Sequence, residues 1–137
     1  MMKHTLIGAC AAALLSPLAA FAEKIEYSDG VVKQALADGR TVFIDYTTEW
    51  CSTCAAQKDV INAALDQNPA YEENILFVTV DWDEYSRAPI AVDHNIPRRS
   101  TLIVLKGDDE LGRNVANARA SDVKALLDVA LEAASTS

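Results

Sequence analysis

Residues 42–54 read VFIDYTTEWCSTC, and this stretch decides the fold. Its unbroken apolar run, 42–44, predicts a strand over 41–47 that is buried on both faces. The apolar pattern that begins at Cys51 predicts a helix that runs to about Asp66. The two cysteines of the C-x-x-C motif therefore stand where a buried strand passes directly into a helix.

The position of the cysteines indicates redox chemistry. Cys51 stands at the helix N-terminus, where backbone N–H groups and the helix dipole favour a thiolate. Cys54 lies one turn further in, close enough to attack a mixed disulfide formed on Cys51. We therefore expect a Cys51–Cys54 disulfide and a two-step exchange, in which Cys51 attacks or is attacked and Cys54 resolves.

Two other interpretations of the pair are a static structural disulfide and half of a zinc site. A closed zinc site needs about four ligands. Beyond the N-terminal segment, the chain offers Cys51, Cys54 and one histidine, His94, which we expect at the surface near a helix end. This shortage of ligands favours redox use, and we expect no metal. We also expect no organic cofactor, because no Gly-rich phosphate loop follows a strand.

The first residues have the pattern of a secretory signal peptide. A basic start precedes an apolar run over 6–20, and residues 20–22 read AFA, an A-x-A processing site. We expect residues 1–22 to be removed, Cys10 with them, leaving a domain over 23–137 in the periplasm or outside the cell. The alternative is an N-terminal anchor that is retained.

The composition is that of one folded globular domain. The 137 residues carry 12 Lys and Arg against 20 Asp and Glu, a net charge of −8. Such a protein lacks the basic face that phosphate binding needs, so nucleic acid is not expected as a partner. We expect a monomer.

The rest of the chain alternates between helical and strand patterns. Strands are expected over 75–80, 101–105 and 111–115, and helices over 29–38 with a cap at Ser28 or Asp29, over 86–92, and at the C-terminus from a cap at Ser121. Strands that alternate with helices predict an α/β domain, with a mixed sheet covered by helices.

Residues 42–54, the segment 100–106 and the final helix together resemble the thioredoxin superfamily. The shared pattern is an apolar strand, an acid, an aromatic residue, two further residues, an acid, Trp and C-x-x-C. The resemblance covers nearly all of the chain beyond residue 22. It is closest to the secreted thioredoxin-like domains of periplasmic disulfide reduction, including the C-terminal domain of the transmembrane disulfide reductase. It implies a thioredoxin fold, protein dithiols or disulfides as substrates, and a membrane electron donor.

Asp45 lies six residues before Cys51, inside the apolar strand. Burial should raise its pKa, which makes it a candidate proton acceptor for Cys54, and the resemblance implies the same role. In many thioredoxins a lysine on the neighbouring strand pairs with this acid, but residues 77–79 here contain none. The alternative is an Asp satisfied by buried water or backbone.

The residues around the cysteines have supporting roles. Trp50 is expected either to pack beside the site and shield the thiolate or to be a core aromatic. Ser52 and Thr53 separate the cysteines and bring no charge, and the Thr53 hydroxyl could donate to the thiolate. The resemblance implies that these two residues tune the reduction potential.

The sequence departs from the family pattern before the third long strand. Ser100 stands where the resemblance implies a cis-proline that faces the cysteines, contacts substrate and keeps metals away; Pro97 comes three residues too early. The bond before Ser100 is therefore either trans, with a rearranged loop, or cis and strained. Arg98 and Arg99 should lie near Cys51, where they stabilise the thiolate or recognise an acidic partner segment; the alternative is a solvated loop pair.

Together these features predict a thiol–disulfide oxidoreductase that acts mainly in the reducing direction. The same site could run in reverse, as a disulfide oxidant or isomerase. A third interpretation is a thioredoxin-fold metal-binding or docking module, which the missing proline would favour.

Overall fold

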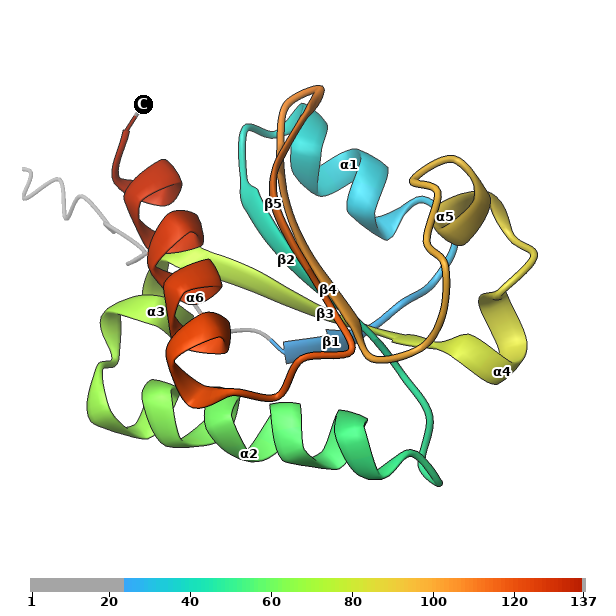
Figure 1. The fold of residues 1–137 in the computed structure, drawn as a ribbon. Coiled ribbons are helices and arrows are strands. Elements are labelled where there is room, and N and C mark those ends of the chain that lie inside the picture. The colour runs from blue at the N-terminus through green and yellow to red at the C-terminus, as the bar shows by residue number, and fades with distance from the viewer. Residues whose placement is uncertain (1–23, 137) are drawn as a thin grey trace, which may run out of the picture.

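The computed structural model describes residues 24–136. The expected signal peptide and Cys10 lie outside the described residues. Within them, the predicted α/β architecture is confirmed: a mixed sheet lies between two layers of helices (Figure 1).

The sheet has five strands in the order β1-β3-β2-β4-β5. They are β1 (Lys24–Glu26), β2 (Thr41–Thr47), β3 (Ile75–Asp81), β4 (Thr101–Lys106) and β5 (Asp109–Val115). Strand β3 pairs in parallel with both β1 and β2, whereas β4 runs antiparallel to β2 and β5. The predicted strand over 41–47 is thus β2, and it lies at the centre of the sheet.

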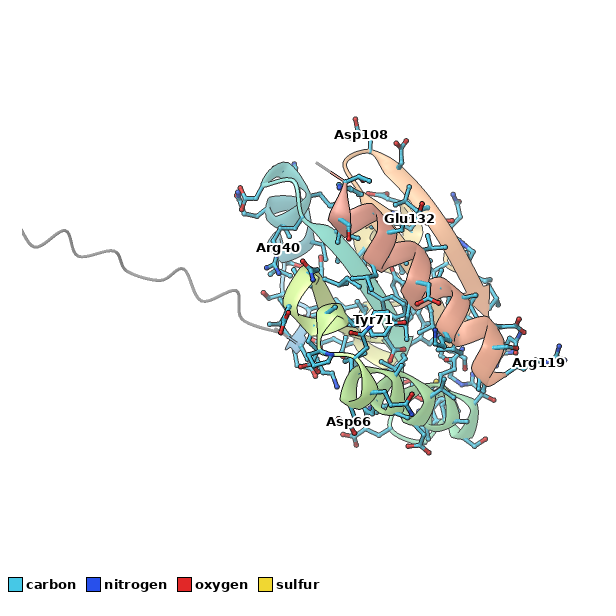
Figure 2. All side chains as sticks on the ribbon, turned by 90° about the vertical axis from the view of Figure 1, so that its left-hand side faces the viewer. Arg40, Asp66, Tyr71, Asp108, Arg119 and Glu132 are labelled. Atoms are coloured by element: carbon cyan, nitrogen blue, oxygen red, sulfur yellow. A yellow bond between two sulfur atoms is a disulfide. The ribbon has the colours of Figure 1, made fainter. Side chains whose placement is uncertain are left out.

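The helices are α1 (Val31–Ala37), α2 (Ser52–Gln67), α3 (Ala70–Asn74), α4 (Trp82–Tyr85), α5 (Pro89–Val92) and α6 (Ala120–Ser135). Helices α2, α3 and α6 cover one face of the sheet, and α1, α4 and α5 cover the other (Figure 1). The Tyr71 hydroxyl of α3 donates a hydrogen bond to Asp128 of α6, which joins two helices of the first layer. Figure 2 shows Tyr71 on the side of the molecule that these helices form.

The two helical layers explain the unbroken apolar run of β2. Val42, Ile44 and Tyr46 pack into the core on the α1 side, while Phe43 packs into the core on the α2 and α6 side. Successive side chains of a strand point to opposite faces, so a strand covered on both faces favours consecutive apolar residues such as 42–44. Asp45 shares the face of Phe43 and is therefore turned towards α2.

Two expected helices differ in detail from the structure. The expected helix over 86–92 is shorter in the structure, because Ala88, which precedes Pro89, is extended and only Pro89–Val92, α5, is helical. The C-terminal helix begins at Ala120, after Arg119, so the predicted cap at Ser121 is wrong.

The start of α1 and three short elements were also not predicted. Helix α1 follows Gly30, which has a φ of 87°, in place of a side-chain cap at Ser28 or Asp29. Helix α3, of five residues, helix α4, of four, and strand β1, of three, are absent from the expected elements. Elements this short carry too little apolar periodicity to be recognised from sequence.

We predict that Tyr46→Phe lowers the free energy of unfolding by about 1–2 kcal/mol, because the Ile90 carbonyl loses a buried donor. The fully buried Tyr46 hydroxyl donates to that carbonyl over 2.6 Å and ties α5 to β2. Urea unfolding of both proteins measures the difference. An unchanged midpoint and slope would show that this hydrogen bond contributes no net stability.

Candidate active site

The two cysteines form a disulfide at the start of α2, with their Cα atoms 5.2 Å apart. Cys51 is the N-cap of the helix, and its sulfur accepts the backbone N–H of Cys54 over 3.1 Å. Cys51 is 6% exposed and Cys54 only 1%. A partner sulfur can therefore reach Cys51 more readily than Cys54, and the helix N-terminus faces the Cys51 sulfur.

The Ser100 side chain contacts both sulfurs of the disulfide. Its hydroxyl oxygen is 3.1 Å from the Cys51 sulfur and 3.2 Å from the Cys54 sulfur. Disulfide sulfurs carry no hydrogen, so the hydroxyl is the donor in this oxidised state. The site residue nearest both sulfurs is therefore the one at which the sequence departs from the family pattern.

The backbone at Ser100 answers the question that the sequence left open. Every peptide bond between residues 24 and 136 is trans, including the bond before Ser100. Ser100 instead takes a left-handed conformation, with a φ of 62°. This conformation costs a non-glycine residue about 1–3 kcal/mol unless its surroundings hold it there. The loop is therefore rearranged rather than cis.

Three hydrogen bonds hold the Ser100 backbone. Its N–H donates to the Tyr46 carbonyl over 2.8 Å, and its carbonyl accepts the Ala116 N–H over 2.8 Å. The same carbonyl accepts the Gln57 side-chain amide over 3.0 Å. A proline at this position would lack the N–H that reaches Tyr46, and its ring would require a negative φ.

Gln57 is a site residue that the sequence analysis missed. It is fully buried on α2, and its amide nitrogen also donates to the Asn117 carbonyl over 3.2 Å. The available signal was a glutamine among the inward positions of this helix, which are otherwise occupied by Cys54, Ile61, Ala64 and Leu65. A buried amide at such a position needs polar partners, and here they come from two loops at the site.

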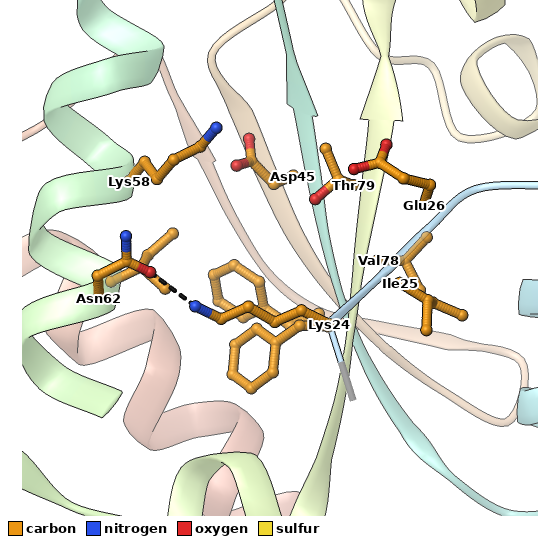
Figure 3. A pocket seen from close by; sticks show the side chains of 11 residues that line it. Lys24, Ile25, Glu26, Asp45, Lys58, Asn62, Val78 and Thr79 are labelled. Carbon is orange, nitrogen blue, oxygen red and sulfur yellow. Dashed lines mark hydrogen bonds between the residues drawn. The ribbon is translucent and has the colours of Figure 1, made fainter. Parts of the chain in front are cut away.

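Asp45 lines a cavity of about 270 Å³ between β1, β2, β3 and α2 (Figure 3). The residue is 8% exposed, and one carboxylate oxygen has no hydrogen-bond partner among the described residues. Burial raises the pKa of Asp45 from 3.8 to about 6, while Lys58 lowers it and Glu26 raises it. The predicted rise is confirmed.

The cation that faces Asp45 is Lys58, which comes from α2 and not from the neighbouring strand. Thr79 of β3 stands opposite Asp45 in the register, so the neighbouring strand supplies no lysine, as the sequence indicated. Figure 3 shows the Lys58 ammonium of α2 pointing towards the Asp45 carboxylate across the cavity. A lysine on a helix thus compensates in part for the buried charge.

Trp50 is 62% exposed, so the interpretation of a core aromatic is wrong. Its indole N–H donates to Asp83 over 2.9 Å, and the Arg99 guanidinium lies 4.2 Å from the ring centre. Arg98 is exposed and donates to the Arg99 carbonyl. One arginine of the pair is therefore stacked on the tryptophan, and the other is solvated.

The remaining predicted residues are peripheral to the sulfurs. Ser52 is exposed and Thr53 half-buried, and the hydroxyl that reaches the sulfurs is that of Ser100 rather than Thr53. His94 is half-buried and follows α5. Among residues 24–136, no group of three or more His, Cys, Asp or Glu side chains could hold a metal ion.

We predict that Asp45 makes the protein less stable as the pH rises from about 4 to about 6. In this range the folded protein retains the Asp45 proton while the unfolded chain has released it, so unfolding becomes easier as pH increases. A rise of about two pKa units corresponds to a loss of about 3 kcal/mol in the free energy of unfolding across this pH range. Urea unfolding at several pH values should show that Asp45→Asn gains stability over the parent across this range. A constant difference would contradict the raised pKa.

Comparisons with known proteins agree with this geometry. The family model described as Thioredoxin matches residues 22–129. The thiol:disulfide interchange protein TxlA of Synechococcus elongatus is 29% identical over 100 residues, which are 72% of this chain and 51% of that protein. The chain thus spans about half the length of this curated relative.

Two solved structures have the same fold. Trxlp from Edwardsiella tarda is 25% identical, with a TM-score of 0.66 over 76% of this chain and 98% of its own. The thioredoxin Mala s 13 of Malassezia sympodialis is 26% identical, with a TM-score of 0.66 over 79% of this chain and 93% of its own. The fold, the buried acid, the C-x-x-C disulfide at a helix N-terminus and the family match place this chain in the thioredoxin family.

Proposed function

We propose that this chain catalyses thiol–disulfide exchange with protein partners through Cys51 and Cys54, mainly as a reductant. The observation that carries the proposal is the asymmetry of the pair. Cys51 is the more exposed cysteine and lies at the N-terminus of α2, whereas Cys54 is almost fully buried one turn further in. This is the arrangement that an attacking thiolate and a resolving thiol require.

In the reducing direction the exchange has two steps. The Cys51 thiolate attacks a substrate disulfide, so that a mixed disulfide forms and one substrate thiolate leaves. Cys54 then gives its proton to Asp45 and attacks the Cys51 sulfur, and the second substrate thiolate leaves. The substrate gains two electrons, and the Cys51–Cys54 pair becomes the disulfide that the structure contains.

Direction and location rest on the sequence. The resemblance to periplasmic reducing domains favours reduction. The pattern of residues 1–22 favours export to the periplasm, where a membrane thiol–disulfide protein would supply electrons to this monomeric domain. Of the helices in residues 24–136, none has both the length and the apolar character to cross a membrane.

The equilibrium with glutathione tests the proposal. We expect a reversible two-electron couple near or below about −220 mV, with the reducing members of the family. We also expect Cys54→Ser to accumulate a mixed disulfide with substrate and Cys51→Ser to form none. A couple near about −120 mV would make the protein an oxidant. A parent protein without a reversible couple would contradict thiol–disulfide exchange altogether.

We predict that the resolving step becomes faster as the pH rises through about 6, because Asp45 must be ionised to accept the Cys54 proton. The rate can be measured by loading Cys51 with thionitrobenzoate and following release of the coloured thiol. Asp45→Asn should slow release by about a hundredfold and abolish its rise near pH 6.

The lysine that faces Asp45 provides a second variant for the same measurement. Lys58→Met removes a charge that lowers the Asp45 pKa, so the rise in rate should move to higher pH. Lys33→Met removes an exposed lysine from α1, on the opposite face of the sheet, and should leave the profile unchanged. Equal profiles for Lys58→Met and the parent would show that Lys58 does not act on this acid.

A further inference from the structure

The Ser100 hydroxyl contacts both sulfurs of the disulfide at nearly equal distances, 3.1 and 3.2 Å. A hydroxyl has one hydrogen, so it donates to one sulfur at a time. Rotation about a single side-chain bond exchanges the two acceptors, because Oγ already lies within reach of both. No proline could supply such a donor at this position.

We propose that Ser100 is a catalytic residue whose hydroxyl donates a hydrogen bond to whichever of the two sulfurs carries negative charge during exchange. The proposal rests on the exchange chemistry proposed above. In the reduced protein the acceptor is the Cys51 thiolate. Hydrogen bonds to charged groups are stronger than those between neutral groups, so the hydroxyl stabilises the reduced, ionised form.

The exchange steps require this donor to change partners. While Cys51 attacks a substrate disulfide, its negative charge passes to the first substrate thiolate, which leaves. When Cys54 gives its proton to Asp45, the negative charge appears on the Cys54 sulfur, and the Ser100 hydroxyl turns to it. Cys54 then attacks Cys51, and the electron pair leaves with the second substrate thiolate. Ser100 keeps its own proton throughout.

The surroundings of Ser100 hold this donor in place. Ser100 is fully buried, and its N–H and carbonyl are bound to Tyr46, Ala116 and Gln57, so the backbone has little freedom to move. Those contacts also maintain the left-handed φ that directs the side chain at the sulfurs. Gln57 touches neither sulfur, and we assign it as a positioning residue that acts through Ser100.

Ser100→Ala is the direct test, because alanine retains the Cβ atom and is about as strained as serine at a positive φ, so that the substitution removes only the hydroxyl. We expect the Cys51 pKa, followed by the ultraviolet absorbance of the thiolate, to rise by about one to two units. The equilibrium with glutathione should shift about tenfold towards the disulfide, which is a potential about 30 mV more negative.

Two further variants separate the hydroxyl from the backbone. Ser100→Gly also lacks the hydroxyl but adopts a positive φ without strain, so it should raise the Cys51 pKa as Ser100→Ala does. Thr41→Val removes another buried hydroxyl, at the end of β2 remote from the cysteines, and should leave both the pKa and the potential unchanged.

A double-mutant cycle tests the role of Gln57. Gln57→Leu alone should raise the Cys51 pKa, because Ser100 is less firmly held. In the Ser100→Ala background the same change should add no further rise, since the hydroxyl through which it acts is gone. If Gln57 had only a structural role, Gln57→Leu would lower the free energy of unfolding and leave the Cys51 pKa unchanged in both backgrounds.

The outcomes distinguish this inference from the function on which it rests. Suppose that the parent is redox-active and that Ser100→Ala and Ser100→Gly have the same Cys51 pKa and the same glutathione equilibrium as the parent. The hydroxyl then has no part in the exchange and the inference is wrong, while the proposed activity stands. If the parent itself shows no reversible couple, the proposed activity fails first.

Discussion

The double pairing of β2 is the constraint on which the rest of the site depends. Hydrogen bonds to β3 on one edge and β4 on the other fix its position and its register. That register turns Asp45 towards α2, presents the Tyr46 carbonyl to the Ser100 N–H, and delivers the chain to the start of α2 at Cys51. A strand free on one edge could shift or fray, and Asp45, the cysteines and the Ser100 loop would no longer be held in fixed positions relative to one another.

Sequence reasoning was most successful where the pattern is local. The bounds of β2, the helix after the cysteines and the buried state of Asp45 follow from apolar runs and from an acid placed within one. The partners of these residues could not be predicted in the same way. Lys58 approaches Asp45 from a helix, and Gln57 reaches Ser100 across 43 positions of sequence. Such contacts depend on how α2 packs on the sheet, which no periodicity encodes. The conformation of the bond before Ser100 could not be predicted either, because the Ser100 backbone is held by distant residues such as Tyr46, Ala116 and Gln57.

The site combines the buried carboxyl of Asp45 with the buried hydroxyl of Ser100, and the two groups differ in how far hydrogen bonds offset the cost of their burial. Ser100 uses all its polar atoms within the protein, which makes its loop rigid despite an unfavourable φ. Asp45 instead leaves one carboxylate oxygen without a hydrogen-bond partner within residues 24–136, and it lines a cavity with charged walls. A fully satisfied acid would hold its charge too firmly to exchange a proton near neutral pH, whereas an unsatisfied one remains close to the protonated state.

Strand β1 gives the cavity its outer wall. Only three residues long, it contributes Lys24, Ile25 and Glu26 to the lining, and the Lys24 ammonium is anchored to Asn62 of α2 over 2.7 Å (Figure 3). These residues begin one position after residue 23, the first residue that would remain if 1–22 were removed as we propose. In the proposed exported form, the position of the cut would therefore affect the pKa of Asp45, which burial raises. A cut a few residues further along would remove the wall, admit water to Asp45 and return that carboxyl towards an ordinary, weakly basic state.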